Sequence, residues 1–555
     1  MPKRYVSWHD PTYMRVHDRG ARRVPHFMDT TTHTHIHTHI HTNTHAHTHT
    51  YIRARILISK MARGTKRSSD TPNPQAKRTR KANTAPEVPS SPLRPIPSSK
   101  DRQSLSTSNF KPINGLHFER SIASLPNTLF DLFQLFCPLN LVQQWVKYTN
   151  ERPFWVTKEG NQAHHAQGPS RQYSRQNAWK PTTISEIYIF FGILIYMSAH
   201  EEAYIPDYWS LSNPPHDISR FMSRNRFMLL YRRFSMWDRT TDEISTFERI
   251  DPWSTHIQRI SMQLWKPGSR VAIDEAMVKF TGRSTDTVNL PSKPIPIGYK
   301  IWVLADHGYF LRWSFHQKGQ GPVNLNLKEY PNLAPTQAVV AHLLNQLPPP
   351  PTPQHGYHCF MDNLFSTPEL FELLRTKNIA ATGTARIQRV SSKQLAAIKV
   401  SESKKDSIPW GTIYARKHTS AEVMQFGFKD NAFVLALSTA YIGYEEPVLK
   451  ERRRPSKTSS NAKTARVPFA GQATKELEIP YFINAYNNNM NGVDIGDQLR
   501  ANSYSSDRRI RRGGWQALYH LFLLEVSVLN CHLLQRHSSI GPQRGSRVFR
   551  KQLYT

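Results

Sequence analysis

Short apolar runs separated by turns dominate the chain between residues 270 and 362. They read "RVAIDEAMV" from Arg270, "GYKIWVLAD" at 298–306, "YFLRWSFHQ" at 309–317 and "YHCFMD" at 357–362. Their length and composition predict buried strands, and the His307-Gly308 dipeptide predicts a hairpin between the second and the third run. The following "STPELFELLRTKN" predicts a helix capped by Ser366 and Glu369.

Acidic residues stand at the ends of two of these runs. Asp274 follows "RVAI" and Asp362 follows "YHCFM", while Asp494 is a third candidate further along the chain. One aspartate at a strand end is commonly a turn former or a helix cap. Several that converge predict a site for hard divalent cations such as Mg²⁺, which bind carboxylate, water and phosphate oxygens. Two such ions ~3.5–4 Å apart can stabilise the attacking and leaving oxygens of a phosphodiester displacement.

The segment "NNNMNGVDIGDQL", residues 487–499, has two interpretations. In the first, it is a turn and a helix start, and Asp494 is a first-turn acid that interacts favourably with the helix dipole. In the second, the Asn-Gly turn directs this helix start toward the sheet edge that carries Asp274 and Asp362. Asp497, one turn further on, is then a fourth ligand or a polar residue that faces the same cleft.

Helical patterns precede the strands. The run "LFDLFQLFCPLNLVQQWV" lies within 125–146, and "IYIFFGILIYM" spans 187–197 after a capping-box pattern at Thr183 and Glu186. The second run is too short to cross a membrane, which takes ~20 residues, so it predicts a buried helix.

A basic and aromatic segment, residues 221–238, combines two faces. Apolar residues at 227, 230, 231 and 234 have the spacing of a buried helical stripe. The remaining positions form a solvated basic face or a phosphate-binding face. The arginines concerned are Arg224, Arg226, Arg232 and Arg233.

The net charge indicates the class of partner. The chain has 73 Lys and Arg against 41 Asp and Glu, a formal charge of +32. Such an excess predicts attraction to a polyanion, and duplex nucleic acid is the densest common one. No lipidation motif is found, so no membrane partner is expected. The three cysteines form no CxxC pair, which argues against a cysteine-rich metal module and favours a reducing compartment.

Polar segments flank and interrupt the apolar regions. Residues 1–114 have the composition of a disordered tail, with a Thr-His repeat at 30–51 that resembles a translated dinucleotide repeat, so Met61 is the expected start. Basic clusters at 66–67 and 77–81 favour nuclear import. Residues 447–475 predict a basic loop or linker.

An ordered series of motifs resembles the piggyBac family of DNA transposases over roughly 118–550. The matching blocks are "MSRNRFMLLYRRFSMWD" (222–238), "AIDEAMVKFTGRS" (272–284), "PSKPIPIGYKIWVLAD", "FMDNLFSTPELFELLRTKNIAATGTAR" (360–386) and "NNNMNGVDIGDQL" (487–499). Many family members end in a Cys-rich zinc-binding domain, whereas this sequence ends at Thr555 without one.

The resemblance implies an RNase H-like α/β catalytic domain with an insertion domain, and a mostly helical dimerisation and DNA-binding domain formed from segments on both sides of it. The implied boundaries are 1–114 for the tail, 115–268 and 500–555 for the helical domain, 269–386 and 436–499 for the catalytic domain, and 387–435 for the insertion.

The resemblance also implies a mechanism and its residues. Asp274, Asp362 and Asp494 would bind two Mg²⁺ or Mn²⁺ ions, with Asp497 as a further catalytic residue. The enzyme would cut and paste double-stranded DNA at TTAA sites, as a nuclear homodimer. Phosphate contacts are expected from Arg283, Lys293, Lys300 and Arg386, and from a basic cluster of Arg508, Arg509, Arg511 and Arg512.

Two other functions stay open from the sequence. The first is a transposase-derived DNA-binding protein without transposition activity, which the missing Cys-rich end favours. The second is a basic scaffold or RNA-binding protein, which rests on the charge alone.

Overall fold

The computed structural model describes residues 109–554, except 152–178, 201, 211–215, 239–243, 292, 460, 502–512 and 539–544. The Thr-His repeat, Met61 and the two basic clusters before residue 82 lie outside the described residues. So does the basic cluster of Arg508, Arg509, Arg511 and Arg512.

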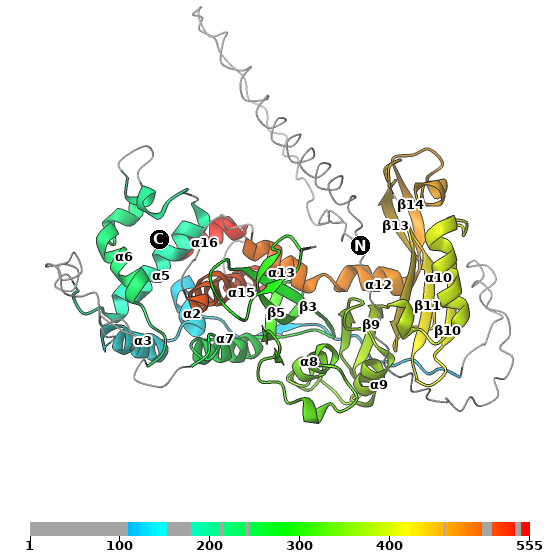
Figure 1. Ribbon diagram of the computed structural model, residues 1–555, viewed down its shortest axis with the longest axis horizontal. Helices are drawn as coiled ribbons and strands as arrows, with labels where there is room; N and C mark the ends of the chain where they lie inside the picture. Colours follow the sequence, from blue (N-terminus) through cyan, green and yellow to red (C-terminus); the bar gives the residue numbers. More distant parts are fainter. Residues whose placement is uncertain are drawn as a thin grey trace, which may run out of the picture. The chain divides into compact units, whose positions relative to one another are not determined.

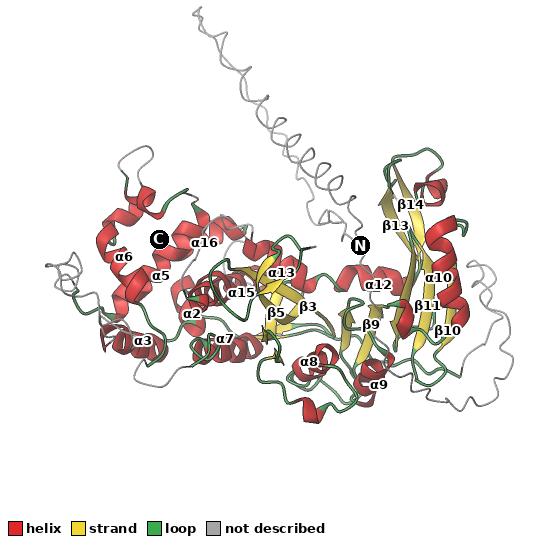
Figure 2. Ribbon diagram, in the orientation of Figure 1, coloured by secondary structure: helices red, strands yellow, loops and turns green. Residues whose placement is uncertain are grey.

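A mixed sheet forms the centre of the described chain (Figures 1 and 2). Its strand order is β10-β11-β12-β9-β8-β3-β5-β6-β7, and β4 pairs with β5 at the side. β3, β5 and β6 are antiparallel neighbours, whereas β8 runs parallel to β3 and β9 runs parallel to β8. The strands are β3 (Arg270–Lys279), β4 (Val288–Asn289), β5 (Ile297–Asp306), β6 (Tyr309–Gln317), β7 (Gly321–Pro322), β8 (His358–Met361), β9 (Ala380–Thr384), β10 (Ile413–Lys417), β11 (Met424–Lys429) and β12 (Phe433–Ser438).

The predicted hairpin is confirmed. β5 and β6 are joined by His307 and Gly308, which have φ angles of 47° and 97°. Two consecutive residues with positive φ match the right-handed twist of the flanking strands, and glycine accepts this conformation without steric cost.

Helices from both ends of the described chain pack together. Cys531 lies against the Leu132 carbonyl, and buried Arg550 pairs with Glu525 at 2.6 Å and donates to Ser198 Oγ at 3.0 Å. The helices before the sheet are α2 (Leu129–Phe136), α3 (Leu139–Glu151), α5 (Ile184–Ala199), η3 (Ile205–Trp209), η4 (Asp217–Arg220), α6 (Arg224–Arg233) and α7 (Asp251–Leu264). Those after it are α14 (Gly514–Leu518), the π-helical η8 (Tyr519–Leu524), α15 (Glu525–His537) and α16 (Ser546–Tyr554).

The predicted capping of α5 is confirmed, since Thr183 Oγ1 accepts from the Glu186 backbone N–H. The 187–197 run is buried almost throughout. The described residues also contain one helix long and apolar enough to cross a membrane, Gly514–His537, and 94% of its most apolar window is buried inside the protein. This helix therefore serves as the core of the helical region.

Helices cover both faces of the sheet. Trp313 of β6 donates its backbone N–H to Gln258 Oε1 at 3.0 Å and its indole N–H to Ser254 Oγ at 2.9 Å, which fixes α7 on one face. The same face carries Asp274, because Trp313 and Asp274 both pair with Val303. Trp302, on the opposite face, contacts Phe365 just before α9. The remaining helices of this part are α8 (Pro335–Leu344), α9 (Pro368–Thr376), α12 (Tyr481–Asn489) and α13 (Gly492–Ala501).

One capping prediction is wrong by one residue. Thr367, not Ser366, caps α9, with its Oγ1 accepting from the Leu370 backbone N–H at 3.2 Å. Ser366 instead donates its hydroxyl to the Asp362 carbonyl at 2.9 Å. The two adjacent hydroxyl residues give the same sequence pattern, and the turn after β8 decides which one caps the helix.

The region 387–435, expected as an insertion, continues the sheet. Helix α10 (Lys393–Lys405) precedes β10, and β12 pairs antiparallel with β9. The expected boundary at 435 falls inside β12, and the one at 499 falls inside α13.

The loop predicted at 447–475 is wrong, because this segment contains most of a hairpin. β13 (Val448–Arg453) pairs antiparallel with β14 (Thr474–Ile479), and α11 (Ala462–Ala465) and η7 (Val467–Phe469) lie between them. β13 is exposed or half-buried along its length, so it lacks the apolar alternation that identifies a strand from sequence.

Two glycines let α13 lie directly on the sheet. A Cβ atom at Gly492 would stand 3.2 Å from Ala272 Cβ, and one at Gly496 would stand 2.2 Å from Phe310 Cε1 and 2.6 Å from the Gly308 carbonyl oxygen. The missing side chains therefore set the depth at which this helix packs against β3 and the β5–β6 hairpin.

We expect Gly496→Ala to lower the free energy of unfolding by about 1–3 kcal/mol, because the new methyl group overpacks this contact. Gly192→Ala in α5 is the control, since its Cβ would meet no atom within 4 Å. It should raise stability by up to ~1 kcal/mol through helix propensity alone. Urea denaturation of both variants measures the difference, and equal effects would contradict the packing argument.

Candidate active site

The register of β3 and β8 brings two predicted acids together. Asp274 lies within β3 and is 1% exposed. Met361 pairs with Ile273 in parallel register, so Asp362 follows at the level of Asp274 on the neighbouring strand. Adjacent strands are ~4.8 Å apart, which makes these two aspartates direct neighbours.

Helix α13 lies on the Asp274 side of β3. Gly492 approaches Ala272, and Ala272 and Asp274 point to the same face because side chains alternate along a strand. Asp494 is in the first turn of α13, as the sequence predicted, and is half-buried. Burial raises the pKa of Asp497 and the negative charge of Asp274 raises it further, while Arg500 and Lys293 act in the opposite direction. The Asp497 carboxylate is therefore close enough to Asp274 for the two charges to interact.

Two lysines complete the group. Lys293 Nζ pairs with Glu275 Oε1 at 2.5 Å. The ammonium of Lys300 lies 3.7 Å from the centre of the Trp302 ring. Burial lowers the pKa of Lys300, whereas the carboxylates of Glu275, Asp274 and Asp362 partly restore it. We call Asp274, Glu275, Asp362, Asp497, Lys293 and Lys300 the acid–lysine cluster.

Glu275 is a member that the sequence analysis missed. Its Oε2 is buried and has no hydrogen-bond partner among the described residues. Burial and the neighbouring Asp274 raise the pKa of Glu275. Its position directly after Asp274 in the sequence could have indicated that Glu275 lies near the site. Side chains alternate along a strand, however, so this position alone would point Glu275 away from Asp274.

Arg500 is a second residue that the sequence analysis missed. This guanidinium is buried and donates to Asp497 Oδ1 at 3.0 Å from Nη2 and 3.2 Å from Nε. It also donates to the Leu521 carbonyl at 2.5 Å and to the Met277 carbonyl at 3.3 Å. Arg500 thus fixes Asp497 while joining α13 to β3 and to the π-helical segment.

The donor chemistry of the cluster suits a hard divalent cation. Carboxylates gathered in a buried site repel one another, and the unpartnered Glu275 oxygen is a free hard donor. In the described ranges, however, no three His, Cys, Asp or Glu side chains form a group that could hold a metal ion. The positive charges among the acids are those of Lys293, Lys300 and Arg500.

The arginines of α6 divide into two kinds. Arg226 pairs with Glu186 at 2.6 Å. Arg226 and the buried Arg233 also lie over the Trp179 ring, each with 4.6 Å between its guanidinium carbon and the ring centre. Those two side chains therefore stabilise the helical region. Arg224 and Arg232 are exposed on the same helix.

Two further predicted phosphate contacts lie at the ends of strands. Arg283 is exposed in the loop after β3. Arg386 follows β9, is exposed, and donates from Nε to Asn363 Oδ1 at 3.3 Å, beside Asp362. Arg386 is thus close to the acid–lysine cluster.

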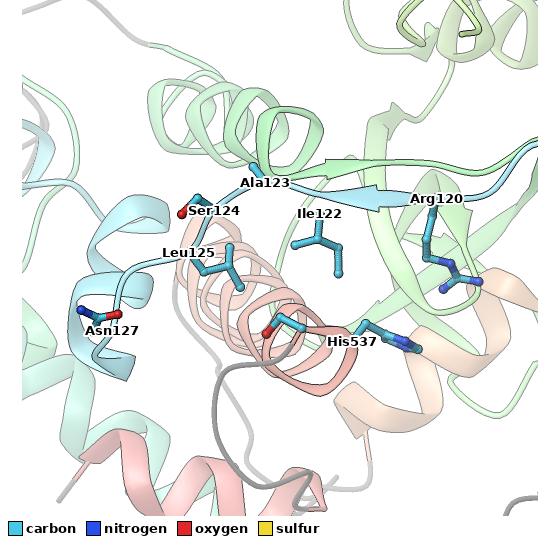
Figure 3. A pocket seen from close by; sticks show the side chains of 8 residues that line it. Arg120, Ile122, Ala123, Ser124, Leu125, Asn127 and His537 are labelled. Carbon is cyan, nitrogen blue, oxygen red and sulfur yellow. The ribbon is translucent and has the colours of Figure 1, made fainter.

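A separate hollow of about 660 Å³ lies away from the predicted acids (Figure 3). Arg120, Leu125, Asn127 and His537 are among the residues that line it. None of the predicted site residues contributes to this lining.

Comparison with known proteins places the chain in a family. A family model described as "Transposase IS4" matches residues 130–532, which include every aspartate discussed above. The chain belongs to this family of transposases. Within it the resemblance to piggyBac-type transposases is confirmed by the relative and the solved structure described next.

One curated relative is PiggyBac transposable element-derived protein 2 of Homo sapiens, 24% identical over 379 residues. The match covers 67% of this chain and 58% of the relative, so the chain spans less than two thirds of that protein's length. One similar solved structure is the cryo-EM structure of the piggyBac transposase synaptic complex with hairpin DNA, with a TM-score of 0.58, 19% identity and coverage of 79% of this chain and 82% of the other. This second likeness concerns the fold.

We expect Arg500→Met to lower the free energy of unfolding by about 2–4 kcal/mol, because it leaves the Asp497 carboxylate largely buried without its counter-charge. Adding Asp497→Asn should recover part of that loss, since the unpaired charge is then gone. A double-mutant cycle by denaturant titration measures the coupling. Additive effects of the two substitutions would contradict the contact.

The same variant should respond to pH with a defined sign. The pKa of Asp497 is already above its ordinary value, and loss of Arg500 raises it further. A raised carboxyl pKa means that stability is present at low pH and is lost as pH rises through that pKa. Arg500→Met should therefore be less destabilising at pH 4.5 than at pH 8. If the variant and wild type differ in free energy of unfolding by the same amount at both pH values, this interpretation of the Asp497–Arg500 contact is wrong.

Proposed function

We propose that this protein is a cut-and-paste DNA transposase that hydrolyses phosphodiester bonds and transfers strands at TTAA sites, with Mg²⁺ or Mn²⁺. The observation that carries the proposal is the register that sets Asp274 beside Asp362, together with helix α13, which carries Asp494 and Asp497 and packs on the Asp274 side of β3. The strand order β6-β5-β3-β8-β9, in which β5 alone runs antiparallel to the other four strands, supports an RNase H-like catalytic domain.

The residues have distinct roles in this proposal. Asp274, Asp362 and Asp494 would hold the divalent ions, with Asp497 and Glu275 as further carboxylates of the same site. Bound ions of this kind supply Lewis-acid activation and neutralise charge that develops on the phosphate. Arg500 holds Asp497 in one orientation. Lys300 and Arg386 carry positive charge next to the acids, where a phosphate oxygen of DNA would be attracted.

Several features of the proposal rest on the resemblance. Double-stranded DNA as transposon end and target, a homodimer, two metal ions and nuclear localisation are all proposed on that basis. The DNA named in the matched synaptic complex is a property of that protein and supports the choice of polymer here.

The second candidate is a transposase-derived DNA-binding protein without transposition activity. The name of the human relative, a transposable element-derived protein, favours it. The contact of Asp497 with Arg500 also favours it, because one carboxylate is already engaged by a cation.

A cleavage assay separates the two candidates. Purified protein is incubated with Mg²⁺ or Mn²⁺ and with DNA that carries the flanking inverted repeats next to TTAA. Asp274→Asn should reduce strand cleavage by at least ~100-fold, because an acid central to metal binding is lost, and should leave DNA binding nearly unchanged.

Glu446→Gln is the matched control, since Glu446 is an exposed acid outside the acid–lysine cluster. It should cleave like wild type. If wild type and Asp274→Asn both bind the DNA equally and neither cuts it, the transposase proposal fails and the DNA-binding candidate stands.

A further inference from the structure

The β13–β14 hairpin contains a long segment without acids. Residues 452–475 include seven Lys and Arg residues and no Asp or Glu. We call this segment the basic hairpin. Its acidic neighbours in sequence, Glu451 and Glu476, face each other across the two strands just outside it. The positive charge is therefore concentrated toward the connecting end of the hairpin.

Little of this charge is compensated. Within the described residues, Arg452 is the member of the basic hairpin that forms an ion pair, with Asp430 at 3.1 Å. Lys475 donates to the Pro468 carbonyl at 2.8 Å, and Arg454 and Arg466 donate to the carbonyls of Gly471 and Pro455. Bonds to neutral carbonyls fix these side chains and leave their charge in place.

The basic hairpin is anchored to the fold and is not a loose tail. Phe469 and Leu477 are buried in the same apolar cluster as Phe426 of β11 and Phe482 of α12. Thr464 Oγ1 donates to Asp406 Oδ1 at 2.6 Å, which ties the connecting segment to the end of α10. The charges therefore occupy a preformed surface.

Three cations of this surface point to solvent. Arg453, Lys457 and Lys463 are exposed, and none of them forms a hydrogen bond or ion pair with any residue that the structure describes. A fixed group of uncompensated cations matches a partner with closely spaced negative charges. Duplex DNA carries one charge per ~1.7 Å of helix axis.

The aromatic content argues for duplex DNA over single strands or RNA loops. Proteins bind unstacked bases by stacking them on exposed aromatic side chains. Phe469 is the aromatic residue of the basic hairpin, and it is 3% exposed and packed inside the protein. The surface therefore offers charge to a phosphate backbone and no stacking platform for bases.

The basic hairpin is linked to the acid–lysine cluster by one short helix. β14 ends at Ile479, α12 spans Tyr481–Asn489, and α13 with Asp494 and Asp497 begins at Gly492. Phe482 of α12 stacks on Phe426 with 4.4 Å between ring centres, which fixes this helix against β11. The nine residues of α12 span about 13 Å and the six residues of β14 about 20 Å, so the exposed cations are separated from α13 by up to about one ~34 Å turn of a DNA duplex.

We propose that the basic hairpin, residues 452–475, binds the phosphate backbone of the duplex DNA whose scissile bond lies at the acid–lysine cluster. This inference rests on the proposed function for its DNA partner. The surface binds without reading sequence, because it presents charge and no base-reading element. It holds the flanking duplex while the cluster acts on a bond up to about one duplex turn away.

The test compares two triple variants in full-length protein that also carries Asp274→Asn, so that DNA stays intact. The first is Arg453→Ala/Lys457→Ala/Lys463→Ala. The matched control is Lys318→Ala/Lys328→Ala/Lys377→Ala, which removes the same charge from exposed positions outside the hairpin. Fluorescence anisotropy with a labelled 40-base-pair duplex, a labelled single-stranded RNA and labelled heparin gives affinities across a salt series, and thermal melts check folding.

The hairpin variant should weaken duplex binding on the order of 100-fold at 0.1 M salt and flatten the plot of log affinity against log salt by about 2.7, because three phosphate contacts are lost. The control should change neither value, and both melting temperatures should equal that of the parent. Equal slopes for the two variants would overturn the inference. So would loss of RNA or heparin binding with duplex binding kept.

Wild-type cleavage activity is measured in parallel and reports on the proposed function separately. If wild type cleaves DNA and the hairpin variant binds the duplex as tightly as its parent, the inference is refuted and the proposed function is not. A selective loss of duplex binding without any wild-type cleavage supports the basic hairpin as a DNA surface and refutes the transposase proposal. Absence of duplex binding by the parent protein refutes both.

Discussion

The site depends on the close packing of helix α13 against the sheet. Gly492 and Gly496 have no side chain, so the helix backbone lies almost directly on β3 and the β5–β6 hairpin. A larger residue at either position would collide with Ala272 or Phe310 and move the helix outward. This helix carries Asp494 and Asp497. Its depth therefore sets how close the Asp497 carboxylate lies to the charge of Asp274. Arg500 then ties the same helix to two other elements, β3 and the π-helical η8.

The electrostatics of the acid–lysine cluster follow from that packing. Burial raises the pKa values of Glu275 and Asp497 and lowers that of Lys300, so each charge depends on its neighbours of opposite sign. A site of this kind is suited to a ligand that brings both positive ions and phosphate, since the carboxylates accept the first and the lysines the second. The basic hairpin adds a second group of cations, separated from the acids by β14 and α12.

Much of the fold was readable because local patterns and tertiary contacts agree. The β5–β6 hairpin follows from two apolar runs and a His-Gly turn, and the buried helix α5 follows from its cap and apolar length. Asp362 and Asp494 were noticed because one follows a strand and the other starts a helix, and Asp274 because it follows an apolar run, although it lies inside β3. The β13–β14 hairpin was missed because its side chains are mostly exposed, and backbone pairing leaves no trace in such a sequence. Glu275 and Arg500 were missed because nothing local shows that they are buried against distant partners.

The sequence by itself determined the central strands, the buried helices, the family and the excess of positive charge, since these depend on residue type, spacing and order along the chain. The tertiary structure alone decided which charges compensate one another. It committed Arg226 and Arg233 to Trp179 and Arg500 to Asp497, and it left Arg453 and Lys463 exposed on an anchored surface. All of these are cations in the sequence. What separates them is the distance to a counter-charge and the loss of water around it, and both arise only when segments far apart in the chain are packed together.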